Sequence, residues 1–232
     1  MNAEKDKAML NYLLGFVSQN KQNKFDEVIQ NRTRYLTVVL EDIYQPHNAS
    51  AVLRSCDCFG IQDVHIIENQ NTFHVNPDVA LGSSKWLNLI KYNQKVNNTP
   101  EAMKQLKSKG YRIVATTPHK DDVDLQDLDL EKGPVAMVFG TEMRGLTDEG
   151  LALADEYMKI PMYGFTESFN ISVSAALCLF YLTEKLRASA INWQLSEAEQ
   201  VEVKLAWARQ VIKRSDLLEK KFLETGESGR TE

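Results

Sequence analysis

The feature that most constrains the fold is a series of short apolar runs, each followed by a segment with helical character. Buried strands are predicted from YLTVVLEDI at 35–43, DVHIIE at 63–68, YRIVATT at 111–117 and PVAMVFG at 134–140. Between the first two runs, NASAVLRSCDCFG predicts a helix that ends at Gly60. A strand–helix–strand order of this kind requires parallel pairing. The sequence therefore predicts an α/β fold, a parallel sheet flanked by helices, from about residue 35 to residue 187.

Outside this core, the sequence predicts helices at both ends of the chain. We expect an N-terminal helical extension at 1–34, a core domain at 35–188, and a C-terminal amphipathic helix with a tail at 189–232. Ser196 and Glu199 form a capping-box pattern that opens one continuous helix over 197–223. Basic residues in these segments have two interpretations, a solvated or packed helix surface and a surface that contacts RNA phosphates. They are Lys21, Lys24, Arg32, Arg34, Arg209, Lys213 and Lys220.

The composition excludes several classes of protein. A net charge of −5 argues mildly against a nucleic-acid partner, although a local basic face matters more than the sum. The chain has no run of 18 apolar residues and no signal-peptide pattern, so we expect a cytoplasmic protein without a membrane partner. Three cysteines do not make a disulfide framework, and Cys56 and Cys58 point to different faces of a helix. We therefore expect no metal. The acidic segment 121–129 predicts a solvated turn region.

A further strand is predicted from YMKIPM at 157–162. Three polar clusters follow predicted strands, at the edge where open α/β sheets bind ligands. The third opens a long apolar helix with more polar side chains than a cap requires. Each cluster also has a structural interpretation: Asn48 as a helix cap, Arg54 as a surface ion-pair partner, and the second cluster as a tight turn. The members are Glu41, Asp42, Gln45, His47, Asn48 and Arg54; Gly140, Thr141, Glu142, Arg144 and Gly145; and Thr166, Glu167, Ser168 and Asn170.

Taken in order, these segments resemble the three motifs of the SpoU branch, also called TrmH, of the SPOUT RNA methyltransferases. The matching segments are PHNASAVLRSCDCFGI at 46–61, VFGTEMRGL at 138–146 and IPMYGFTESFNISVSAAL at 160–177. YLTVVLEDIYQ at 35–45 and ALGSSKWL at 80–87 resemble the tRNA-acting members, which methylate the ribose 2′-hydroxyl of guanosine 18 in the D-loop. The alternatives are a ribosomal RNA 2′-O-methyltransferase of the same family and a non-catalytic RNA-binding module on this fold.

The resemblance implies S-adenosylmethionine as methyl donor, tRNA as partner and a homodimer whose active site is completed across the subunit interface. It also implies a deep trefoil knot at about residues 140–187, an exception to the rule against knots. Phe169 stands where the family commonly has leucine. The implied catalytic residues are Asn48, Arg54, Glu142, Ser168 and Asn170, and the implied donor-binding residues are Thr116, Gly140, Ile160, Met162 and Phe169.

Methyl transfer from a sulfonium to an alcohol needs alignment and removal of the hydroxyl proton, and it needs no metal. Arg54 is a poor base because a guanidinium resists deprotonation. We therefore expect Arg54 to hold the substrate phosphate and stabilise developing negative charge, while the proton leaves through a phosphate oxygen or water. His47 is a second candidate base, weighed against a structural role.

Overall fold

A computed structural model describes residues 3–118, 123–141 and 144–225. The chain divides into two compact units. One unit contains Thr33–Trp193, and the other combines Met1–Arg32 with Gln194–Glu232. Among the described helices, none is long and apolar enough to cross a membrane.

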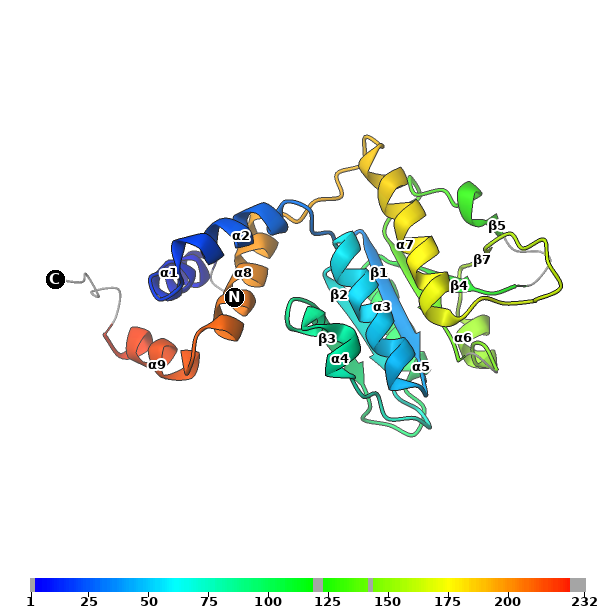
Figure 1. Ribbon diagram of the computed structural model, residues 1–232, viewed down its shortest axis with the longest axis horizontal. Helices are drawn as coiled ribbons and strands as arrows, with labels where there is room; N and C mark the ends of the chain where they lie inside the picture. The colour runs from blue at the N-terminus through cyan, green and yellow to red at the C-terminus, as the bar shows by residue number, and fades with distance from the viewer. Residues whose placement is uncertain (1–2, 119–122, 142–143, 226–232) are drawn as a thin grey trace. The chain divides into compact units, whose positions relative to one another are not determined.

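The Thr33–Trp193 unit is built on a parallel sheet, as its β-branched strands predict. The seven described strands are ordered β3-β2-β1-β6-β4-β7-β5 (Figure 1). They are β1 Leu36–Glu41, β2 Asp63–Ile67, β3 Asn88–Tyr92, β4 Arg112–Thr116, β5 Val123–Asp124, β6 Val135–Phe139 and β7 Glu156–Lys159. Central strand β1 pairs Val38 with Val64 of β2 and with Met137 of β6. The predicted α/β class is confirmed.

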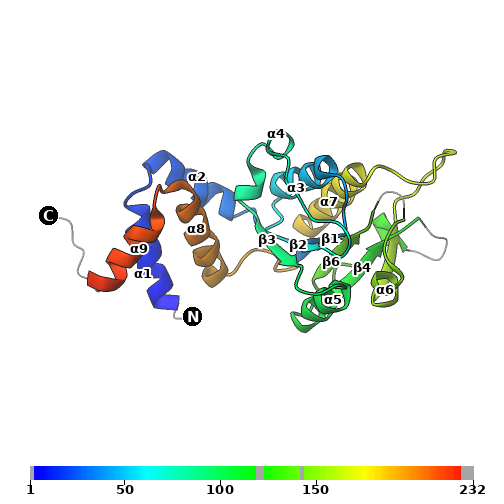
Figure 2. The same cartoon turned by 90° about the horizontal axis from the view of Figure 1, so that it is seen from below.

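Helices cover both faces of this sheet (Figure 2). Because successive strand residues point to opposite faces, Val38 packs under one helical layer and Val39 under the other. The first layer contains α3 Pro46–Phe59 and α7 Ile171–Arg187, and the second contains α5 Thr99–Ser108 and α6 Asp148–Ala152. Shorter helices are α4 Pro77–Ala80, η1 Ser83–Lys85 and η2 Leu125–Asp127.

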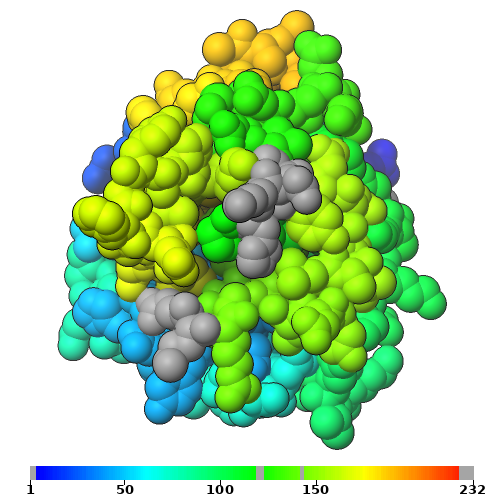
Figure 3. Space-filling model, turned by 90° about the vertical axis from the view of Figure 1, so that its right-hand side faces the viewer, coloured from blue at the N-terminus to red at the C-terminus, as the bar shows by residue number. Residues whose placement is uncertain are grey.

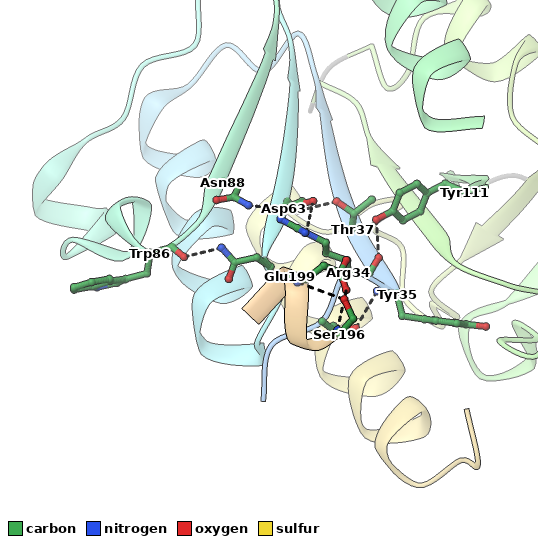
Figure 4. A network of polar contacts seen from close by, with 11 residues as sticks. Arg34, Tyr35, Thr37, Asp63, Trp86, Asn88, Tyr111, Ser196 and Glu199 are labelled. Carbon is green, nitrogen blue, oxygen red and sulfur yellow. Dashed lines mark hydrogen bonds and ion pairs between the residues drawn. The ribbon is translucent and has the colours of Figure 1, made fainter. Parts of the chain in front are cut away.

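The edge of the sheet where β1 and β2 begin is closed by polar contacts (Figure 4). Arg34 Nε lies 3.1 Å from Asp63 Oδ2, and Asn88 Nδ2 donates to Asp63 Oδ1 at 2.8 Å. Tyr111 Oη donates to the Arg34 carbonyl oxygen at 2.6 Å. Arg34 is therefore part of the structure of the sheet rather than a solvated charge on an N-terminal arm.

The structure of the connection from β4 to β6 differs from the solvated turn region that the sequence predicts there. Its described part forms strand β5 and helix η2, and it buries three leucines that alternate with the acidic residues: Leu125, Leu128 and Leu130. Asp121 and Asp122 lie outside the described residues. Strand β7 lies between β4 and β5 in the sheet, so this connection passes around β7. Lys185 Nζ of α7 donates to the Gln126 and Leu128 carbonyl oxygens at 2.9 and 2.8 Å.

The second unit is helical. It contains α1 Ala3–Leu14, α2 Gln19–Ile29, α8 Glu197–Val211 and α9 Ser215–Thr225. Met9, Leu10 and Leu13 of α1 pack against Leu205 and Ala208 of α8. The two ends of the chain, distant in sequence, thus share one apolar core.

The C-terminal segment was predicted as one helix over 197–223, and this is wrong. The chain breaks between α8 and α9, where Ile212 is extended and Arg214 has a φ of 61°. The predicted Ser196–Glu199 capping box is present. Arg209 pairs with Glu219 across the break at 2.6 Å, so its charge is partly neutralised, as the interpretation of a packed helix surface allows.

Candidate active site

A pocket opens at the carboxyl edge of β4, β6 and β7. It has a volume of about 300 Å³, which is at the small end of the range of small-molecule sites. Figure 3 looks onto this end of the unit, where the 160–170 loop lies beside a hollow, with the described parts of the β4–β6 connection and of the segment after β6 around it. All five predicted donor-binding residues line the pocket: Thr116, Gly140, Ile160, Met162 and Phe169.

The backbone after β6 forms one wall of this pocket. Thr141 and Gly145 exchange two backbone hydrogen bonds of 2.9 Å, which close the loop on itself. A Cβ atom on Gly140 would lie 2.2 Å from the Gly145 carbonyl carbon and 2.4 Å from Leu146 N. Only glycine allows this approach, so the close packing of the loop explains the residue type at 140. The competing interpretation of the cluster as a tight turn is also correct, because the turn is itself the pocket wall.

The opposite wall is largely apolar. Ile160 and Met162 follow β7, and Phe169 precedes α7, with its side chain partly exposed. Thr116 at the end of β4 donates from Oγ1 to the Val138 carbonyl oxygen at 2.8 Å, which fixes its side chain at the pocket floor. Apolar side chains face a backbone loop across the cavity. That combination fits a ligand with a flat apolar part and polar edges.

A second pocket of about 330 Å³ lies beside the first and shares Thr141, Arg144 and Ile171 with it. Asn48 lines the second pocket, and Ser168 lines the first. The side chains of Asn48 and Asn170 meet although they are far apart in sequence. Asn170 Nδ2 donates to Asn48 Oδ1 at 3.2 Å. The structure thus brings the first and third motifs into direct contact.

Asn48 and Asn170 combine structural and site roles. Asn170 Oδ1 accepts from Ser172 N at 2.8 Å as the N-cap of α7, while Asn48 Nδ2 donates to Gln45 Oε1 at 3.0 Å. The predicted capping role of Asn48 is wrong: Gln45 occupies the N-cap of α3 and Asn48 lies within the helix. Its amide is buried and directed to Asn170.

Arg54 and His47 are not brought to either pocket in this chain. Both lie on α3 with exposed side chains, seven positions apart and therefore on one face of the helix. Neither lines the two cavities described above. Glu142 lies outside the described residues.

Arg144 is a residue that the predicted catalytic set omits. Its side chain lines both pockets. Arg144 N donates to Thr141 Oγ1 at 3.1 Å, which holds its backbone in the loop. Its place in the second polar cluster was a signal for this position, because a cation after a strand end is suited to phosphate. The charge is therefore available at the boundary between the two cavities.

Burial shifts the pKa values of two side chains, Cys178 in the first pocket and His65 in the core. Cys178 lines the first pocket, and burial raises the pKa of its thiol to about 12, so it is neither nucleophile nor base. Burial, with a smaller contribution from Lys109, lowers the pKa of His65 to about 4. His65 contacts Tyr92 Oη at 3.0 Å in the core. The described residues that line the two pockets include no histidine.

Comparison with known proteins identifies relatives over most of the chain. The SpoU rRNA Methylase family matches residues 35–180. A tRNA (guanosine(18)-2′-O)-methyltransferase of Borreliella burgdorferi is 46% identical over 204 residues, which are 88% of this chain and 91% of that protein.

Solved structures show the same fold. The TrmH/SpoU tRNA modifying enzyme of A. aeolicus aligns with a TM-score of 0.73 and 29% identity, over 84% of this chain and 98% of that one. The SpoU methyltransferase AviRb of Streptomyces viridochromogenes, solved in complex with AdoMet, aligns with a TM-score of 0.58 and 22% identity, over 70% of this chain and 62% of that one.

Proposed function

Since the chain belongs to the SpoU methylase family, we propose that it transfers a methyl group from S-adenosylmethionine to the ribose 2′-hydroxyl of guanosine 18 in tRNA. The observation that carries this proposal is the 46% identity to a tRNA (guanosine(18)-2′-O)-methyltransferase over 88% of the chain. The cytoplasm, where tRNA is processed, is the proposed location.

The first pocket fits the methyl donor. The wall made by Ile160, Met162 and Phe169 suits an adenine ring, and the backbone loop from Gly140 offers polar groups to its edge. Thr116, fixed by its bond to Val138, closes the floor. S-adenosylmethionine would supply the methyl group, and its sulfonium sulfur would leave as a neutral thioether, so the transfer needs no metal. Among the described residues, no group of three or more His, Cys, Asp or Glu side chains could hold a metal ion.

The second pocket is the proposed place of the target nucleotide. Asn48 and Asn170, joined at 3.2 Å, form a fixed amide pair beside Ser168, and we assign these three residues to alignment of the ribose. Arg144 between the pockets is placed to hold an RNA phosphate. Glu142 keeps the catalytic assignment that the family resemblance gives it.

A homodimer would account for the position of Arg54. Helix α7 exposes a stripe of apolar side chains at Val173, Leu177, Phe180 and Tyr181, with the 4- and 3-residue spacing of one helix face. Phe180 contacts Phe59 at the end of α3, so the stripe lies beside the helix that carries Arg54. Pairing of two such faces would carry Arg54 of one subunit to the pocket of the other, where it would hold the substrate phosphate.

Mixed dimers test this arrangement. Arg54→Ala and Ser168→Ala subunits with different tags are co-expressed and purified as mixed dimers. If each site uses Arg54 from the other subunit, the mixed dimer retains one intact site of two and about half of the wild-type activity. If each site is contained in one subunit, both of its sites are damaged and the mixed dimer is as inactive as the single variants.

The path of the chain around β7 supports the proposed deep trefoil knot over about 140–187. The segment that leaves β7 continues into α7, and α7 is held to the β4–β6 connection by Lys185. The chain is knotted if the segment before α7 passes through this connection, which is the arrangement we propose.

The decisive test is methyl transfer from labelled S-adenosylmethionine to unmodified tRNA transcripts, followed by mapping of the modified ribose. We expect one methyl group at guanosine 18. The matched control is a tRNA with 2′-deoxyguanosine at that position, which lacks only the nucleophile. Lack of incorporation into any tRNA would refute the proposal. Incorporation into ribosomal RNA alone would favour the ribosomal alternative. Donor binding without transfer to either RNA would favour a non-catalytic binder.

A further inference from the structure

Glu41, the last residue of β1, has a charged side chain in the protein interior. The residue is 1% exposed. A buried carboxylate is costly unless hydrogen bonds satisfy it. Oε1 accepts from Thr99 Oγ1 at 2.6 Å and from Thr147 Oγ1 at 2.8 Å, and Oε2 accepts from Thr147 N at 2.9 Å. Two of these three bonds come from Thr147.

Thr147 is the residue at which the pocket wall ends. It follows the 140–146 loop directly and is the N-cap of α6, where its Oγ1 accepts from Gly150 N at 3.0 Å. A Cβ atom on Gly150 would lie 2.9 Å from Glu41 Oε2, so the glycine lets the first turn of α6 approach the carboxylate. The loop is therefore continuous with β6 at one end and fixed by Glu41 at the other.

The position of this loop determines the shape of both pockets. Gly140, Thr141, Arg144 and Gly145 line the first pocket, and Thr141 and Arg144 also line the second. The two bonds between Thr141 and Gly145 close the loop internally and do not attach it to the sheet. At its far end, Leu146 packs in the apolar core, and the Glu41–Thr147 hydrogen bonds attach the backbone to the end of β1.

We propose that Glu41 is a positioning residue for the methyl-donor site, because its buried carboxylate holds the 140–147 loop in the conformation that forms the pocket wall. The inference rests on the proposed function for the identity of the ligand. It assigns a role to a residue of the first polar cluster that contacts neither pocket through its own side chain, and it explains why a carboxylate lies buried at the end of a central strand.

Three variants separate positioning from general stability. Glu41→Gln leaves one acceptor oxygen where there were two, and Thr147→Val removes the hydroxyl on the loop side. Thr99→Val is the matched control, since it removes a bond to the same carboxylate from α5 and leaves the loop contacts intact. Thr147→Ser retains the hydroxyl and is the rescue variant.

We expect Glu41→Gln and Thr147→Val to weaken S-adenosylmethionine binding by calorimetry at least ~10-fold. The donor KM should rise by a larger factor than kcat falls. Thr99→Val should lower Tm to a similar degree and change the donor Kd less than ~2-fold, and Thr147→Ser should restore binding. Equal loss of donor affinity in Thr99→Val and Glu41→Gln would overturn the proposal, as would wild-type affinity in Glu41→Gln.

Amide hydrogen exchange provides a readout that needs no ligand. Exchange within 140–147 should accelerate in Glu41→Gln and Thr147→Val relative to Thr99→Val. If the wild-type protein failed to bind S-adenosylmethionine, the proposed function would be wrong, and loop exchange would still decide whether Glu41 fixes the loop. Unchanged exchange in Glu41→Gln would refute the anchoring role.

Discussion

The sharpest prediction concerns Gly140→Ala, since one added methyl group is enough to displace the pocket wall. The new Cβ would lie 2.2 Å from the carbonyl carbon of Gly145, 2.3 Å from its oxygen and 2.4 Å from Leu146 N. Ordinary carbon contacts begin at ~3.5 Å, and all three neighbours are backbone atoms. Relief therefore requires the loop to move by about 1 Å relative to β6.

The size of the effect follows from this overlap. Overpacking of this kind costs about 1–3 kcal/mol of folding free energy. For a chain of this length we expect Tm to fall by roughly 2–4 °C for each kcal/mol. The same displacement moves Thr141 and Arg144, which line both pockets. We therefore expect S-adenosylmethionine affinity to fall at least ~10-fold, equivalent to about 1.4 kcal/mol.

Gly164→Ala is the matched control. The nearest atom to its added Cβ is Thr166 N at 4.0 Å, an ordinary contact. Calorimetric titration with S-adenosylmethionine and thermal unfolding should be run on both variants. Donor binding in Gly140→Ala at wild-type affinity would refute the reasoning, and an equal loss in Gly164→Ala would show that any change in these loops has the same effect.

Three further predictions test other parts of the molecule. Since the pKa of His65 is about 4 in the folded protein and 6.5 for an unperturbed imidazole, the unfolded state binds more protons between these values. The free energy of unfolding should therefore fall by about 3 kcal/mol as pH decreases from above 6.5 to 4. In His65→Gln it should depend less on pH. Equal pH slopes for the wild-type protein and this variant in urea unfolding would contradict the prediction. Asn48→Ala removes the partner of Asn170 and should reduce single-turnover methyl transfer ~10–100-fold with donor Kd within about twofold; an unchanged transfer rate would exclude the amide pair from alignment. Phe180→Asp should shift the protein to monomer in light scattering. Val96→Asp is the control and should leave the oligomeric state unchanged, because this side chain is 93% exposed and away from α7. A dimeric Phe180→Asp protein would place the interface elsewhere.

Local pattern predicted the parallel sheet and the edge at which the polar clusters gather. Strands such as PVAMVFG are apolar on both faces, which is the signature of a parallel sheet covered by two helical layers. Because the carboxyl ends of parallel strands share one edge, the polar clusters after β1 and β6 and the one before α7 had to meet there, and the Asn48–Asn170 contact is the result.

Contacts between distant segments could not be predicted in the same way. The acidic segment after β4 looks solvated, yet its leucines are buried because β7 lies between β4 and β5, an arrangement no local periodicity encodes. Arg32 belongs to a basic N-terminal segment, for which a surface position is the simplest prediction. In the structure it is buried, and its guanidinium lies 5.5 Å from the centre of the Trp207 ring, which comes from the other end of the chain.

Glu41, at the candidate site, is another residue whose environment could not be predicted from the local sequence. Its sequence neighbourhood indicates only an acidic residue after an apolar run, for which exposure is the ordinary expectation. Three bonds from Thr99 and Thr147, residues that follow it by 58 and 106 positions, make the buried carboxylate tolerable. A pocket lined by backbone depends on what holds that backbone, so we expect the residues that determine donor affinity to extend beyond those that line the cavity. Motif matching finds the lining residues, and only the three-dimensional contacts identify the carboxylate that fixes them.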